Sequence, residues 1–218
     1  MDLSAASLWE WTKLFVRDPR LAARLVKEAS LPLEVSVMMI VLAGVVSTAA
    51  SGVYTLIIGS PDMIFAISET EALSITPIGP IGEGLFAVFS GVGMAYAIFR
   101  VGARFGGTGT LADIMAIMAV LQLVVTVIMI IQLTVGLIIP LIGFILAIFA
   151  TYVFFRGLGH TVNEGHNFGS MGKSVWIIFG SFLALSLVAV AVLILIIVLD
   201  LGPSGTLVSL PLSEGTNL

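Results

Sequence analysis

The residues best suited to metal chemistry lie in one glycine-rich stretch, RGLGHTVNEGHNFGSMGK, at residues 156–173. His160, Glu164 and His166 are residue types that bind zinc. Their spacing, H-x3-E-x-H, matches no strong zinc signature, and a loop this rich in glycine would not hold three ligands in a fixed geometry. We therefore interpret the stretch as a solvated polar loop near lipid head groups, and we expect neither a metal nor a cofactor.

A second stretch with possible ligand chemistry is the sequence FGGTGT, which follows Arg100 and Arg104. A glycine-rich loop before a helix can bind phosphate through its backbone N–H groups. The P-loop lysine and a preceding strand are both missing here. We interpret Gly106, Gly107 and Gly109 as a tight cytoplasmic turn, with the two arginines extending toward the head groups.

No residues suited to catalysis come together in the sequence. Ser47, Ser51 and Ser90 lie in apolar segments without an ionisable side chain that could act as their base. Gln122 and Gln132 are also surrounded by apolar residues, where polar side chains commonly form hydrogen bonds across helices. A substrate-binding role for the two glutamines is the alternative. We identify no catalytic residue and do not expect an enzyme.

These residues must be positioned by membrane-spanning helices. The chain is 59% hydrophobic and 10% charged, whereas a soluble domain carries about 25% charged residues. Residues 114–155 contain no Asp, Glu, Lys, Arg or His, and roughly 20 apolar residues cross a bilayer as a helix. Gly136 and Pro140 divide this stretch, so we predict a transmembrane hairpin. Cysteine is absent, which excludes disulfides and thiolate metal sites.

The predicted fold class is all-α: a polytopic membrane protein with an N-terminal amphipathic interfacial helix. A leader of residues 1–33 precedes a transmembrane domain of residues 34–200, and a short non-cytoplasmic tail covers residues 201–218. We also expect a short surface helix at residues 68–74. Small residues recur four apart within the spans and favour close helix packing. The five predicted spans are residues 34–58, 84–103, 111–135, 140–156 and 175–199.

Two local signals predict where helices begin. Asp18 and Pro19 combine an N-cap residue with a proline at the first helical position. Thr110 and Asp113 fit a capping box at the start of the third span.

The leader combines aromatic and apolar residues with a row of cations. Five basic residues recur at spacings of 4, 3, 4 and 3, which places them on one helical face: Lys13, Arg17, Arg20, Arg24 and Lys27. This pattern is typical of a helix in the membrane interface, with its basic side toward anionic head groups. We predict that these residues contact lipid or a partner. The alternative is a helix that docks on the bundle while its basic side is solvated.

The distribution of charge predicts the orientation. All nine Lys and Arg residues fall in the leader, in the Arg100–Arg104 turn that closes the second span, or in residues 156–173. With five spans, those three places share one side of the membrane. The positive-inside rule then places the N-terminus in the cytoplasm and the C-terminus outside.

Five spans, a cytoplasmic leader and a GGxG-type turn, formed by Gly106, Gly107 and Gly109 in RFGGTGT before LADIMAIMAVLQL, resemble the Yip family of Ypt/Rab-interacting membrane proteins. The leader LFVRDPRLAARLVKEASLP is similar to the start of bacterial, especially alphaproteobacterial, members. This resemblance implies a bacterial cytoplasmic membrane protein with a periplasmic C-terminus.

Eukaryotic members of that family bind prenylated Rab-type GTPases, and they carry a long cytosolic N-terminal region with an acidic, aromatic Gly-Pro element. This chain has a short basic leader instead, and its third span lacks the Tyr and Pro that those members tend to carry. The resemblance therefore does not carry GTPase binding over to this chain.

We expect a non-catalytic membrane protein that organises or binds other membrane proteins or lipid, with an accessory subunit of a larger complex as one form of that role. The expected partners are anionic lipid head groups and other membrane proteins or further copies of the chain, and not nucleic acid. The alternative is a small-molecule or ion transporter or channel. Transport pathways usually need ionisable groups or broken helices at mid-membrane, and no predicted span interior contains either.

Overall fold

The computed structural model describes residues 4–59, 63–66, 71–75, 79–198 and 206–209. Five of its helices are long and apolar enough to cross a membrane, so the predicted helical membrane fold is confirmed. They are α3 (Leu33–Ile58), α4 (Pro80–Arg104), α5 (Leu111–Ile138), α6 (Pro140–His166) and α7 (Met171–Val198).

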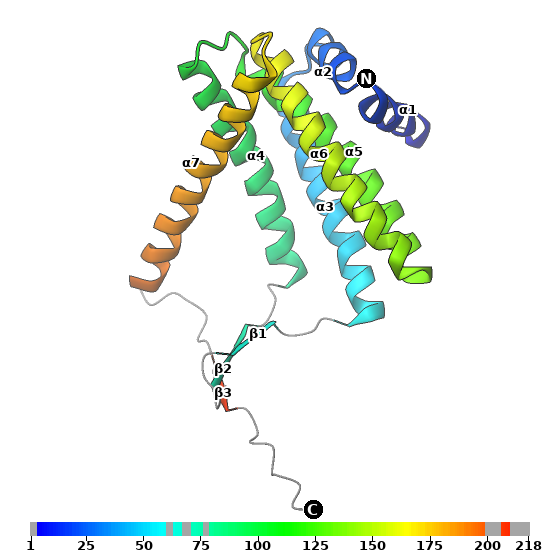
Figure 1. The fold of residues 1–218 in the computed structure, drawn as a ribbon, viewed down its shortest axis with the longest axis vertical. Coiled ribbons are helices and arrows are strands. Elements are labelled where there is room, and N and C mark those ends of the chain that lie inside the picture. The colour runs from blue at the N-terminus through cyan, green and yellow to red at the C-terminus, as the bar shows by residue number, and fades with distance from the viewer. Residues whose placement is uncertain (1–3, 60–62, 67–70, 76–78, 199–205, 210–218) are drawn as a thin grey trace, which may run out of the picture.

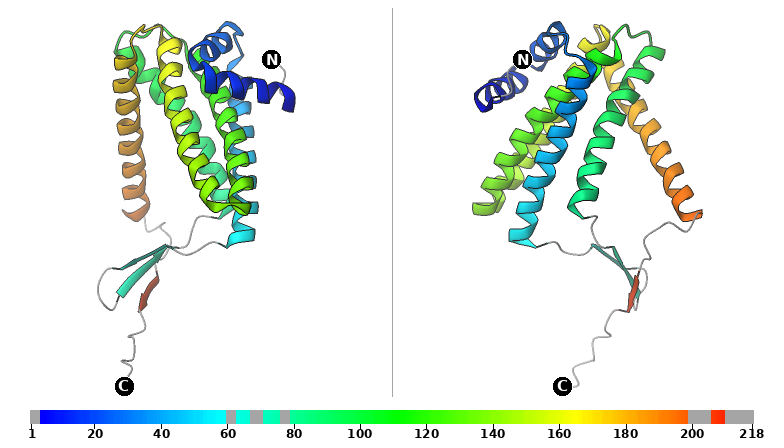
Figure 2. Two further views of the ribbon diagram at one scale, coloured as in Figure 1. Left: turned by 45° about the vertical axis from the view of Figure 1, so that its right-hand side comes forward. Right: turned by 180° about the vertical axis from the view of Figure 1, so that it is seen from behind.

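The five long helices meet at one end of the molecule and spread apart toward the other (Figure 1). α5 is the central helix and contacts α3, α4 and α6, while α7 contacts α4 and α6. Figure 2 shows α7 leaning away from the group that α3, α5 and α6 form. The buried core therefore gathers where the helices converge, around the first half of α5, where Ile114, Ile117 and Leu121 are fully buried.

The predicted hairpin is confirmed, because Ile139 alone separates α5 from α6. The two helices touch through glycine near the tip. A Cβ atom added to Gly143 would lie 2.5 Å from the Cα atom of Gly136. Glycine at position 143 lets the two backbones approach more closely than a side chain there would allow.

The leader forms two helices instead of one: α1 (Ala5–Arg17) and α2 (Pro19–Glu28). The chain bends at Asp18, because a proline disfavours the helical conformation of the residue before it. The carboxylate of Asp18 accepts a hydrogen bond from the backbone N–H of Leu21 at 2.9 Å, so the predicted start of a helix at Pro19 is confirmed. Both leader helices lie at the end where the long helices converge (Figure 1), with α1 against α5 and α2 against α6.

The predicted loop at residues 156–173 is wrong over most of its length, because α6 continues as a helix to His166. The glycines in this stretch provide space for neighbouring helices. A Cβ atom on Gly157 would lie 2.6 Å from Leu121, and one on Gly165 would overlap Ile114. Asn167 ends the helix in the left-handed conformation, at φ 58° and ψ 38°, so only residues 167–170 connect α6 to α7.

Three short strands lie at the opposite end of the molecule from the leader (Figure 2). β1 (Met63–Ala66), β2 (Glu71–Ile75) and β3 (Thr206–Ser209) form an antiparallel sheet in the order β1-β2-β3. The predicted surface helix is wrong at residues 71–74, where pairing with two neighbouring strands satisfies the backbone of β2 instead. Residues 68–70 and most of the predicted tail lie outside the described residues.

Candidate interaction site

The basic face of α2 contacts the end of α6. The carboxylate of Glu164 accepts hydrogen bonds from Nε of Arg20 at 2.7 Å and from Nη2 of Arg24 at 3.4 Å. Nζ of Lys27 donates to the backbone oxygens of Glu164 and Gly165, at 3.0 and 3.2 Å, and to Oδ1 of Asn167 at 2.8 Å. Three of the five predicted leader contacts are thus engaged within the chain itself.

Lys27 performs the function of a helix C-cap on α6. The last carbonyls of a helix have no partner within the helix and carry its negative dipole end, so an ammonium group stabilises them. Ala22, Ala23 and Val26 of α2 are fully buried, so apolar contacts also stabilise the position of α2 on the bundle. The Arg20 and Arg24 side chains are 58% and 49% exposed, so their ion pairs with Glu164 contribute about 1 kcal/mol or less.

The other two predicted leader contacts, Lys13 and Arg17, lie on α1. Nζ of Lys13 pairs with the exposed carboxylate of Glu10 at 2.6 Å. Arg17 is exposed, and its guanidinium forms no ion pair or side-chain hydrogen bond with any residue that the structure describes. The C-terminal carbonyls of α1 accept hydrogen bonds from Arg156, at 2.7 Å for Val16 and 3.4 Å for Arg17. Arg156 thus fastens the end of α1 to α6.

The glycine turn encloses a histidine. The imidazole of His166 is 1% exposed, and its Nε2 lies 3.1 Å from the backbone oxygen of Ile98. A Cβ atom on Gly102 would overlap Nε2 of this ring, and one on Gly107 would overlap Nδ1. The absence of side chains at these two glycines makes room for the imidazole, which gives the turn a packing role.

Hydrogen bonds join the same turn to the end of α6. The N–H of Thr108 donates to the oxygen of His166 at 3.1 Å, and Nδ2 of Asn167 donates to Oγ1 of Thr108 at 2.9 Å. A Cβ atom on Gly109 would overlap the oxygen of Gly165. Gly106 supplies the left-handed conformation of the turn, at φ 84°. The predicted capping box follows directly and is confirmed.

We call this assembly the platform: α1, α2, the turn at residues 106–109, and the end of α6 at residues 156–167. Sequence reasoning identified the turn and the cations but not His166 as the residue that the turn encloses. The histidine itself is the available signal, since an imidazole near the end of an apolar helix needs a polar partner. Arg100 and Arg104, which precede the turn at the end of α4, are exposed, and neither side chain forms a hydrogen bond within the described ranges.

The structure does not assemble the residues considered for zinc. Glu164 is engaged by two arginines, and His166 lies between glycines. Among the described residues, no group of three or more His, Asp or Glu side chains could hold a metal ion.

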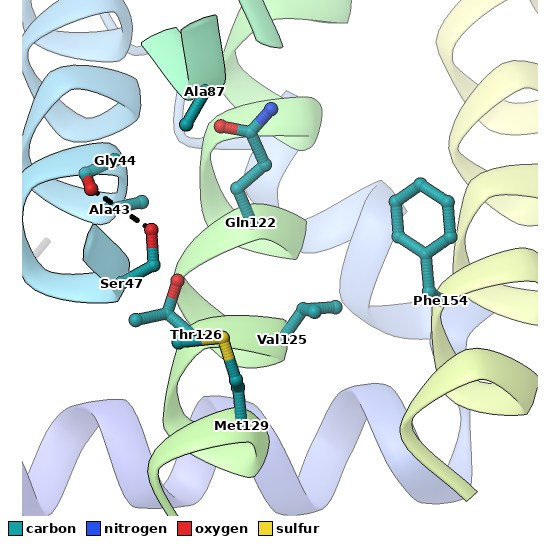
Figure 3. A pocket seen from close by; sticks show the side chains of 9 residues that line it. All are labelled: Ala43, Gly44, Ser47, Ala87, Gln122, Val125, Thr126, Met129 and Phe154. Atoms are coloured by element: carbon teal, nitrogen blue, oxygen red, sulfur yellow. Dashed lines mark hydrogen bonds between the residues drawn. The ribbon is translucent and has the colours of Figure 1, made fainter. Parts of the chain in front are cut away.

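A separate pocket lies between the helices deeper in the bundle (Figure 3). Its volume is about 230 Å³. The amide of Gln122 and the hydroxyl of Thr126 border it, and neither forms a hydrogen bond with the residues that the structure describes, so the cross-helix bond predicted for Gln122 is not found there. The hydroxyl of Ser47 donates to the oxygen of Gly44 at 2.9 Å. The remaining lining is apolar: Ala43, Ala87, Val125, Met129 and Phe154.

Comparison with protein families returns a match to the Yip1 domain over residues 13–207. No curated protein and no solved structure matches the chain. The matched residues begin in α1 and include the leader cations, the glycine turn and the end of α6. The match therefore covers the five long helices and the platform except for residues 5–12 of α1.

Proposed function

The chain belongs to the Yip1 domain family, and from this premise we propose that it is a non-catalytic integral membrane protein that organises or binds other membrane proteins or lipid. One form of this role is an accessory subunit of a larger membrane complex. The positive-inside rule would direct the platform toward the cytoplasm, and the sequence resemblance to bacterial members favours the bacterial cytoplasmic membrane.

The observation that carries the proposal is the platform. Arg20 and Arg24 pair with Glu164, and Lys27 caps α6, so the leader is held in one position on the bundle. A surface that is already ordered loses little conformational entropy when a partner binds. His166, a residue type capable of acid–base chemistry, is buried within the platform. These features support binding rather than catalysis.

The exposed groups near the platform indicate the chemistry of a partner. Exposed cations lie on α1, at the end of α4 and at the start of α7. Two large aromatic side chains accompany them: Trp9, which lines a pocket with Arg17, is 48% exposed, and Phe105, which follows Arg104, is 60% exposed. Cations beside amphipathic aromatic rings suit anionic head groups or an acidic protein surface at the membrane interface. The exposed cations that form no ion pair with the described residues are Arg17, Arg100, Arg104 and Lys173.

Copurification tests this proposal. The full chain is purified in mild detergent from its own membranes, and bound proteins are identified by mass spectrometry and by crosslinking of copies to each other. We expect a reproducible partner that is depleted in the R100Q/R104Q variant. The control is E83Q, which changes a charge near the other end of α4. Recovery of the same proteins by an unrelated five-span protein, or equal recovery by both variants, would contradict the proposal.

The pocket in Figure 3 favours a second candidate function, the passage of a small molecule. Gln122 is a polar group without a partner in the described residues, and it borders a 230 Å³ space between helices. Because the chain has no cysteine, a Q122C variant carries a single reactive thiol. Transport predicts labelling of this thiol by polar reagents from both aqueous sides. The organising role predicts labelling from neither side.

A further inference from the structure

A groove lies between α1 and the α5–α6 hairpin. Its volume is about 230 Å³. Apolar side chains from all three helices form its walls: Trp9, Val16, Ile128, Ile131, Leu146 and Phe149. Thr12 also lines the groove, but its hydroxyl donates to the oxygen of Leu8 at 2.8 Å. The groove interior therefore offers no free polar group to a ligand.

The size of the groove limits what can occupy it. The groove is smaller than the pockets of about 300–1,000 Å³ that enclose drug-sized ligands. A small, partly open apolar space suits one flexible hydrocarbon chain.

The rim of the groove is basic. Lys13 and Arg17 lie four residues apart on α1, on the same helical face, and both line the groove. Lys13 forms an ion pair with Glu10, whereas the guanidinium of Arg17 forms no ion pair with the described residues. Arg156, which donates to the oxygen of Val16 at 2.7 Å, adds a third positive charge nearby. This rim is complementary to a phosphate group.

The cations and the apolar walls are arranged in the same order as the phosphate group and the acyl chain of a phospholipid. The rim belongs to the leader, at the end where the basic residues gather. Ile131 and Leu146 lie on the parts of α5 and α6 that lead toward the hairpin tip, in segments without charge. A phosphate at the rim would therefore direct its attached chain toward the membrane interior.

We propose that the groove beneath α1 binds an anionic phospholipid, with its phosphate at Arg17 and Lys13 and the first part of one acyl chain between α1 and the α5–α6 hairpin. This inference specifies the lipid-binding part of the proposed function and rests on that part. It assigns the leader a defined lipid site instead of a general attraction to the membrane surface.

Native mass spectrometry of the full chain in detergent tests the site with two lipids of matched chain length, phosphatidylglycerol and phosphatidylcholine. We expect the wild-type protein to retain phosphatidylglycerol preferentially. The K13Q/R17Q variant should lose about fivefold in phosphatidylglycerol binding for each cation removed, with phosphatidylcholine unchanged. E83Q, which changes a charge outside the groove, should bind like the wild type, and K13R/R17K should retain the preference.

A second variant tests the acyl chain. L146W fills the groove and should reduce the binding of both lipids, and I131W fills it from α5 should L146W not fold. Equal retention of phosphatidylglycerol by the wild type and K13Q/R17Q, or undiminished binding in the filled variant, would overturn the inference. Partner recovery measured on the same preparations separates the two proposals. A recovered partner without lipid preference refutes the groove site alone, and lipid preference without any partner refutes the protein-organising role alone.

Discussion

At the scale of single residues, His166 connects parts of the chain that are far apart in sequence. Its ring lies against Gly102 at the end of α4 and against Gly107 in the turn, and its backbone oxygen accepts from Thr108. The ring occupies space that a side chain at either glycine would fill. The glycines at positions 102 and 107 therefore have a packing role, because they leave the space that the imidazole occupies.

Replacing Gly102 with alanine should destabilise the protein. The new Cβ atom would overlap Nε2 of His166 and displace the ring from the oxygen of Ile98, to which it now lies at 3.1 Å. Overpacking of this kind costs about 1–3 kcal/mol. Thermal unfolding in detergent measures the effect, with G172A as the control, because the nearest atom to a Cβ there is Oγ of Ser170 at 3.8 Å.

The same pair allows a double-mutant test. If the ring is the obstacle, the cost of G102A should fall in a background that already carries H166A, since interacting residues show non-additive effects. Full additivity of G102A and H166A would show that His166 does not cause the effect.

At the scale of elements, the sequence predicted what local signals determine. Asp18 with Pro19, Thr110 with Asp113, and the break before Pro140 each mark a helix boundary through neighbouring residues, and the structure has these boundaries. Local signals do not predict the end of α6, because Gly157 and Gly165 are residues typical of loops. Their packing role depends on Leu121 and Ile114, which lie against them in the folded chain.

The residues that contact the basic leader could not be predicted either, because that contact also depends on tertiary packing. Lys27 and Glu164 are far apart in the chain, and no local pattern relates the row of cations to the carbonyls of one helix end. Charge periodicity identified the correct face of the leader. Which group lies opposite that face is decided by tertiary packing.

Replacing Lys27 with glutamine should loosen the leader. The variant weakens the contacts of Nζ with two backbone oxygens and with Asn167. For a half-buried ammonium group we expect a loss of about 1.5 kcal/mol, and hence about tenfold faster hydrogen exchange in α2. K173Q, at an exposed position, is the control. E164Q should have a smaller effect that salt reduces further, because both arginines are about half exposed.

The hairpin offers an asymmetric pair of variants. A Cβ atom on Gly143 would lie 2.5 Å from Gly136, whereas one on Gly136 would lie 3.5 Å from Gly143. G143A should therefore cost about 1–3 kcal/mol in thermal unfolding, and G136A should be tolerated. Equal effects of the two substitutions would show that the helices are not in this register.

At the scale of the whole molecule, the position of the basic residues corresponds to the shape of the helix bundle. The leader and the turns that carry the basic residues lie where the long helices converge, and the three strands lie at the other end (Figure 1). All nine Lys and Arg residues belong to the leader, the end of α4, or residues 156–173. An odd number of crossings, with cations on one side, predicts that the two ends of the chain face different compartments.

Single-cysteine labelling in intact cells tests this most directly, because the chain has no cysteine of its own. Three variants are compared: A6C in the leader, A103C beside the glycine turn, and T216C near the C-terminus. A membrane-impermeant maleimide should label T216C in intact cells, and A6C and A103C only after the membrane is opened. Labelling of A6C and T216C from the same side would contradict the five-span topology and the cytoplasmic platform together.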